Sequence, residues 1–113
     1  MHEMSLSQGI VELIEDAARR DGFSNVRTVW LEIGKLASVE MQSLRFCFDV
    51  ATRGSCAEGA RLEIIATAGQ AWCLACGRAI TIDDALADCP LCGSRQVQVT
   101  GGTDMRVKEL EVE

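Results

Sequence analysis

Two stretches of the chain carry apolar residues at the spacing of an amphipathic helix. The first opens with Ser5–Gln8, which has the form of a capping box, and Gly22 is its expected stop signal. The second is predicted to run from an N-cap at Ser38 to about Ala51, with Glu40 in the first turn, where the helix dipole favours a carboxylate. The apolar positions that define these helices are Leu6, Ile10, Leu13, Ile14 and Ala17 in the first and Met41, Leu44, Phe48 and Ala51 in the second.

Between and after the helices the pattern changes to the alternation of half-buried strands. Apolar and polar side chains alternate along Val26–Ile33, and they do so again along Leu62–Ala66. In the last segment, Met105–Val112, the alternation slips out of phase at Lys108-Glu109, which predicts a third strand with a bulge. If the last strand pairs with the first two, the fold is α+β, with two helices on one face of a three-stranded sheet.

The segment from Gly69 to Gly102 differs in composition from the rest of the chain. It holds four of the six cysteines, the only proline and few large apolar residues. A module below about 40 residues usually needs a disulfide, a metal or a partner to stay folded. We therefore expect residues 69–102 to be an inserted, zinc-ribbon-like domain, and residues 1–68 plus 103–113 to form the α+β domain.

Two Cys-x-x-Cys-Gly units predict a metal site in the inserted module. Each turn brings two thiolates to one ion, and a glycine after the second cysteine suits a left-handed backbone. Four thiolates form a closed tetrahedral site, which suits zinc or iron and leaves no position for a substrate. We expect a structural zinc ion. Its ligands would be Cys73, Cys76, Cys89 and Cys92, whereas Cys47 and Cys56 are expected to be a small apolar side chain and a loop thiol.

Two other functions are compatible with the cysteine pattern. A rubredoxin-like electron carrier would bind iron, but the module offers only Trp72 where such a carrier has an aromatic-rich core. An adaptor whose fold is stabilised by zinc would bind only other proteins and would deliver no metal. An enzyme is not expected, because the chain has one histidine, no H-E-x-x-H motif and no nucleophile paired with a base.

The charge of the chain limits its partners. Its 113 residues carry a net charge of -6, from 11 basic and 17 acidic side chains. Affinity for phosphate backbones comes mainly from Lys and Arg, so neither nucleic acid nor an anionic membrane is an expected partner. No apolar run approaches the roughly 20 residues of a membrane span, and the first residues lack the pattern of a signal peptide. We expect a cytoplasmic protein with reduced thiols.

His2, the only histidine, indicates a second metal site at the start of the chain. The Met1 amine, the His2 backbone nitrogen and His2 Nδ1 can close two fused chelate rings on one ion, with a fourth donor from the Glu3 backbone or carboxylate. Such a nitrogen-rich planar set suits Ni(II) or Cu(II). The alternative is a histidine without a function near a frayed chain end.

Several segments together resemble the HypA/HybF family of hydrogenase nickel-incorporation proteins. The resemblance covers essentially the whole chain and combines an initial Met-His-Glu with the two Cys-x-x-Cys pairs. The other matching segments are Ile33–Leu36, Val39–Glu40, Leu44–Phe46 and Ala57–Gly59. The resemblance implies a nickel metallochaperone that works with a GTPase partner to load nickel into the large subunit of nickel-iron hydrogenase. In some organisms such proteins also assist urease maturation proteins.

The resemblance also implies roles for individual residues. His2 would be a nickel ligand with Glu3 and the Met1 amine beside it, and the four cysteines of the paired motifs would bind zinc. Some members use an acidic residue near the start of the second helix to support the nickel site. This chain has Glu40 there, where some relatives have an aspartate. We expect a monomer or homodimer that carries Ni(II) as cargo and Zn(II) as a structural ion.

Overall fold

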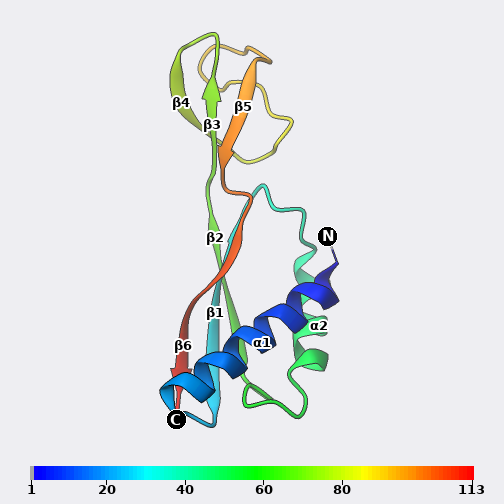
Figure 1. Cartoon of the computed structure of the whole chain (residues 1–113). Helices are drawn as coiled ribbons and strands as arrows, with labels where there is room; N and C mark the ends of the chain where they lie inside the picture. The colour runs from blue at the N-terminus through cyan, green and yellow to red at the C-terminus, as the bar shows by residue number, and fades with distance from the viewer. Residues whose placement is uncertain (1) are drawn as a thin grey trace. The chain divides into compact units, whose positions relative to one another are not determined.

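The computed structural model describes residues 2–113, which form two helices and six strands. The strands build two three-stranded sheets, ordered β2-β1-β6 and β4-β3-β5 (Figure 1). The predicted α+β class, with two helices, a three-stranded sheet and an inserted cysteine module, is confirmed. In chain order the elements are α1 (Glu3–Asp21), β1 (Val26–Gly34), α2 (Met41–Ala51), β2 (Arg61–Thr67), β3 (Gly69–Cys73), β4 (Arg78–Ile82), β5 (Val97–Gly101) and β6 (Met105–Val112).

The chain divides into two compact units. The helical unit is the chain up to Leu31 together with Val39–Ile64 and Val107–Glu113. The cysteine unit is Glu32–Ser38 together with Ile65–Arg106. None of the described helices is both long enough and apolar enough to span a bilayer.

Helix α1 begins earlier than its sequence pattern predicts. Its N-cap is His2 rather than Ser5, and Glu3 occupies the first turn, where a carboxylate suits the positive end of the helix dipole. Gly22 ends the helix as predicted. It has a left-handed φ of 78°, and its N–H donates to the carbonyl of Ala18.

Helix α2 begins later than predicted, at Met41. Its N-cap is Glu40 and not Ser38, so Glu40 precedes the first turn instead of lying within it. The Glu40 carboxylate accepts hydrogen bonds from the backbone N–H groups of Gln42 and Ser43, which have no partner inside the helix. Of the apolar positions predicted for this helix, the structure buries Leu44 and Phe48, half-buries Ala51 and exposes Met41.

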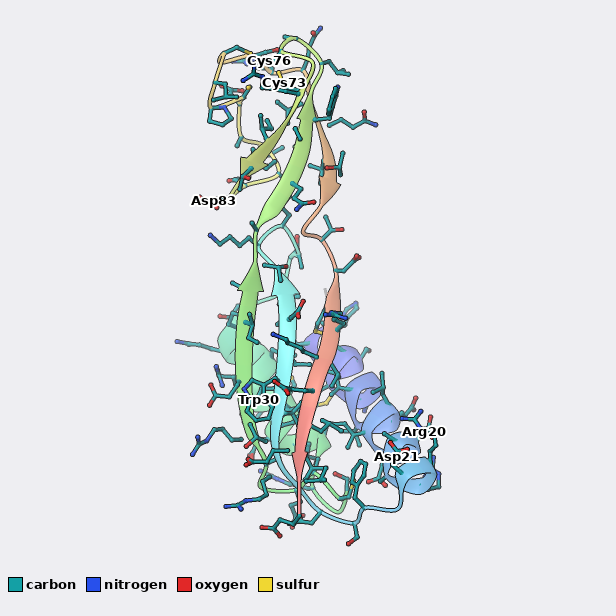
Figure 2. All side chains as sticks on the ribbon, turned by 90° about the vertical axis from the view of Figure 1, so that its left-hand side faces the viewer. Arg20, Asp21, Trp30, Cys73, Cys76 and Asp83 are labelled. Carbon is teal, nitrogen blue, oxygen red and sulfur yellow. The ribbon has the colours of Figure 1, made fainter. Side chains whose placement is uncertain are left out.

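Both helices lie behind the β2-β1-β6 sheet when the sheet is viewed face on, as in Figure 2. In the central strand β1, Val29, Leu31 and Ile33 are buried, as their alternation predicts. Trp30 and Glu32 alternate with them and are only half-buried. The strand therefore presents one apolar face to the core and one mixed face.

The cysteine unit has a small core of its own. Strand β3 pairs antiparallel with both β4 and β5, and a register shift interrupts the β5 side between Gln70 and Ala71. Leu36, in the loop after β1, packs against this core. Its buried members are Ala71, Cys73, Ile80, Ile82 and Cys89.

Three glycines allow backbones to touch in the cysteine unit. A Cβ on Gly34 would lie 2.0 Å from the carbonyl oxygen of Gly102, and a Cβ on Gly102 would lie 2.6 Å from the Cα of Gly69. The Leu36 N–H donates to the Gly102 carbonyl at 2.9 Å, and the Lys35 N–H donates to the Thr67 carbonyl at 2.8 Å. Any side chain at Gly34 must therefore push apart two hydrogen-bonded segments.

We predict that Gly34→Ala destabilises the protein by about 1–3 kcal/mol, because the new methyl group overlaps backbone atoms that cannot rotate away. Gly9→Ala is the matched control. Gly9 lies in α1 with open space around its Cα, so there the same change should stabilise the protein by about 1 kcal/mol through helix propensity. Urea unfolding of the metal-loaded variants measures both. Equal midpoints for the two variants would contradict the packing argument.

Candidate metal centre

Two turns of similar geometry hold the four clustered cysteines. The Gly77 N–H donates to the Cys73 carbonyl, and the Gly93 N–H donates to the Cys89 carbonyl, both at 2.8 Å. The two glycines have φ values of 65° and 76°, so the left-handed backbone predicted at these positions is confirmed. Each turn reverses the chain tightly enough to direct its two cysteines to the same side.

The spacing of the sulfur atoms fits a tetrahedral metal ion. Cys73 Sγ lies 3.7 Å from Cys92 Sγ, and Cys76 Sγ lies 3.8 Å from Cys89 Sγ. All four Sγ atoms lie within 4.8 Å of one another. A tetrahedron with metal–sulfur bonds of about 2.3 Å has edges of about 3.8 Å, so the cluster matches a zinc tetrathiolate closely.

Backbone N–H groups and burial shift the pKa values of the clustered thiols. The Cys76 N–H points at Cys73 Sγ at 3.3 Å, and the Leu91 N–H points at Cys89 Sγ at 3.4 Å. Burial raises the pKa of Cys89, but hydrogen bonds from the Cys92 and Leu91 backbone and from the Cys73 and Cys92 side chains together lower the pKa to about 6. The hydrogen bond with Cys92 and then burial raise the pKa of Cys76 to about 12. An incoming ion must therefore displace protons from this cluster.

The start of α1 brings together two of the acidic residues singled out in the sequence. His2 is exposed and forms the N-cap of α1, but its side chain makes no capping hydrogen bond. The backbone N–H of Glu40 donates to Glu3 Oε2 at 3.3 Å, so the two helix starts meet through this side chain. The Met1 amine lies outside the described residues.

The remaining cysteines stand apart from the cluster. Cys47 and Cys56 are half-buried, and in residues 2–113 the only group of three or more potential ligands is the cluster of four. Burial raises the pKa of Cys56, and the negative charge of Glu15 raises it further. Glu15 also accepts a hydrogen bond from the Cys56 backbone N–H at 2.9 Å. Cys56 is therefore a poor nucleophile in a loop tied to α1.

We predict that a strong chelator, or Cys76→Ser, unfolds the cysteine unit, because a core of five buried residues that includes two of the clustered cysteines cannot replace the metal bonds. Amide exchange of β3 and β5 would rise while α1 stays protected. Cys47→Ser serves as control and should keep the bound metal. A chelated protein with unchanged exchange in β3 would refute the dependence on metal.

A second prediction concerns the cap of α2. Hydrogen bonds from Ser43 and Gln42 hold the pKa of Glu40 below the ordinary value of 4.5. Because the folded-state pKa is lowered, the stabilisation is complete above pH 4.5 and is lost as the pH falls through the folded-state value. The Ser43 amide resonance should titrate with a midpoint below 4.5. Glu40→Gln should abolish this titration, and a midpoint at or above 4.5 would contradict the cap.

The comparisons with known proteins agree with the family that the sequence motifs suggest. Residues 1–112 match the family described as "Hydrogenase/urease nickel incorporation, metallochaperone, hypA". The hydrogenase maturation factors HypA of Albidiferax ferrireducens and Azotobacter vinelandii are 59% and 57% identical over 113 residues, with 100% of each chain covered. The solution structure of the Ni metallochaperone HypA from Helicobacter pylori has a TM-score of 0.72 at 24% identity, covering 99% of this chain and 97% of that one.

The family match spans nearly the whole chain and includes the first residues and all four clustered cysteines. It favours a metallochaperone over the electron carrier and the adaptor that the cysteine pattern alone left open. Maturation factors of this kind are not catalysts, so the protein is not an enzyme. The chain belongs to the HypA family of hydrogenase and urease nickel-incorporation metallochaperones.

Proposed function

We propose that the protein binds one Ni(II) ion at the start of its chain and transfers it to a maturing enzyme. The donors would be the Met1 amine, the His2 backbone nitrogen and His2 Nδ1, with a fourth donor from Glu3. The observation that carries the proposal is the family match, which begins at residue 1 and therefore includes this segment. Nitrogen donors in a plane are a preferred environment for Ni(II).

The surroundings of His2 support this assignment. The imidazole is exposed and free of a capping hydrogen bond, so its nitrogens are available to a metal. The His2 carbonyl accepts a hydrogen bond from the Leu6 N–H at 3.1 Å, which joins the residue to the first turn of α1. The chelating segment would thus be attached to folded structure and still be open to an acceptor protein.

The four clustered cysteines would hold a structural Zn(II) ion. Each domain would then bind one metal: residues 69–102 would form the zinc-binding domain, and residues 1–68 plus 103–113 would form the nickel-binding domain. Four thiolates fill the coordination sphere of zinc, so the bound ion stabilises the fold and has no open position for a substrate. The sulfur spacing described above supports this role.

Delivery requires partners that the family description suggests only in general terms. That description names hydrogenase and urease nickel incorporation. We infer that the acceptor is the large subunit of nickel-iron hydrogenase, reached together with a GTPase partner, and that urease maturation proteins are a second destination. A cytoplasmic location and a monomeric or homodimeric state stay predictions.

The decisive experiment is a Ni(II) titration of zinc-loaded protein with its native N-terminus, followed by calorimetry and visible absorption. One equivalent should bind to the native chain. Binding should be lost in His2→Ala, which removes the imidazole, and in a variant with one extra glycine before Met1. The added residue moves the terminal amine out of the chelate and leaves every side chain in place.

Cys47→Ser is the control for general effects of substitution, and it should bind nickel like the native chain. Equal nickel binding by the native, extended and His2→Ala proteins would show that the nickel site does not lie at the start of the chain. If the native chain binds no nickel, the proposed function is wrong.

A further inference from the structure

The four clustered cysteines differ in how far solvent reaches their side chains. Cys73 and Cys89 are buried, with exposed fractions of 0% and 3%, and Cys76 is half-buried. Cys92 is exposed. It lies in the exposed segment 90–93, where its neighbour Leu91 is also exposed. One member of the cluster is therefore open to small molecules in solution.

This exposure matters because the thiolate, and not the thiol, is the reactive form of a cysteine. A cysteine that binds a metal is held as a thiolate, since the ion displaces its proton. Cys56 has the opposite setting, because burial and the charge of Glu15 raise its pKa and favour the unreactive thiol. In the metal-bound cluster, Cys92 would combine the reactive form with access from solvent.

We propose that Cys92 is a site of oxidation by peroxides, and that the disulfide it then forms with Cys73 converts the cysteine unit from a metal-bound to an oxidised, metal-free state. The inference rests on the proposed structural zinc ion and adds a regulatory role to it. Cys92 Sγ lies 3.7 Å from Cys73 Sγ. A disulfide bond is about 2.0 Å long, so the two sulfur atoms need only a small further approach.

The oxidation would take two steps. In the first, the Cys92 thiolate attacks one oxygen of hydrogen peroxide: an S–O bond forms, the O–O bond breaks and hydroxide leaves. The product is a sulfenic acid, which a second thiolate can attack. In the second step Cys73 forms the S–S bond, and the sulfenic oxygen leaves as hydroxide. The two thiolates lose two electrons, the peroxide gains them, and two protons from solvent convert both hydroxides to water.

The expected disulfide runs between the two cysteine turns. The sulfur contacts of 3.7 and 3.8 Å join Cys73 to Cys92 and Cys76 to Cys89, so each contact links one turn to the other. A disulfide within one turn would close a loop of four residues, and loops that short are stiff. The Leu91 N–H also points at Cys89 Sγ, which holds that sulfur against the backbone of its own turn.

The disulfide would remove two of the four thiolates of the cluster. The two that stay are too few for a tetrahedral structural site, so the ion would be lost. Cys73 belongs to the buried core of the unit and lies in β3, where it pairs with Arg78 of β4 and Val97 of β5. The bond would therefore keep the second turn attached to the central strand. Exchange with a dithiol would restore both thiolates, which makes the change reversible.

The test treats zinc-loaded, full-length protein with hydrogen peroxide and follows zinc release with a chromogenic chelator. Cys92→His keeps four ligands, because three cysteines and one histidine are a common structural zinc set, but it removes the exposed thiolate. Cys76→His is the matched control, since it builds the same ligand set and retains Cys92. We expect release from Cys92→His to be about tenfold slower than from the native chain, and release from Cys76→His to stay within about threefold.

Peptide mapping of the native chain without reductant gives a second readout that needs no variant. At partial oxidation it should reveal a disulfide between Cys73 and Cys92. A dithiol followed by zinc should then restore the original zinc content. Cys47→Ser and Cys56→Ser change thiols outside the cluster and should release zinc at the native rate.

The opposite results decide against the inference. Equal release from Cys92→His and Cys76→His would show that the exposure of Cys92 does not control oxidation. A disulfide between Cys89 and Cys92 would overturn the proposed pairing, and zinc that cannot be restored would overturn the reversible change.

Zinc content before oxidation separates this inference from the site on which it rests. A native chain that holds no zinc would overturn the structural zinc ion and the inference together. A zinc-loaded chain that keeps its ion in peroxide would overturn the inference alone. The nickel titration described above tests the nickel site independently of both.

Discussion

The convergence of four thiols on one point is the constraint on which the cysteine unit depends. Its buried core has only five members, and two of them, Cys73 and Cys89, belong to the cluster itself. A core this small cannot offset the conformational entropy of ordering the unit. Bonds to a metal would supply that missing stabilisation, and the two Sγ–Sγ distances of 3.7 and 3.8 Å match the edges of a tetrahedral site.

The loop after β1 links that unit to the start of α2 along the chain. Leu36 packs on the core that contains Cys73 and Cys89, and its N–H donates to the Gly102 carbonyl. The close approach of Gly34 and Gly102 holds the beginning of the loop. The chain then runs directly from Leu36 to Glu40, which caps α2. The cysteine core and these backbone contacts therefore hold the loop after β1.

Local signals were enough to predict both helices and the strands β1, β2 and β6, but not all of their ends, and they did not predict the strands β3, β4 and β5 of the cysteine unit. Gly22, Gly77 and Gly93 were predictable because a left-handed turn has few alternatives to glycine. The caps at Ser5 and Ser38 were wrong, since several residues near each helix start can cap it and tertiary contacts select one. The hydrogen bond between Glu40 and Glu3 joins residues far apart in sequence, so no local pattern could reveal it.

Under the proposed function, the structural site must retain its ion, whereas the nickel site must release its ion to an acceptor. It also matters that zinc fills the cysteine cluster before nickel arrives. The clustered thiols surround their ion on all sides, and Cys73 and Cys89 are buried, whereas His2 is exposed at the end of the chain. Divalent nickel and copper also bind thiolates strongly, so an empty cluster would compete with the nitrogen chelate for the cargo. Zinc in the cysteine cluster would remove that competitor. The structural ion would thereby contribute to nickel selectivity without touching nickel.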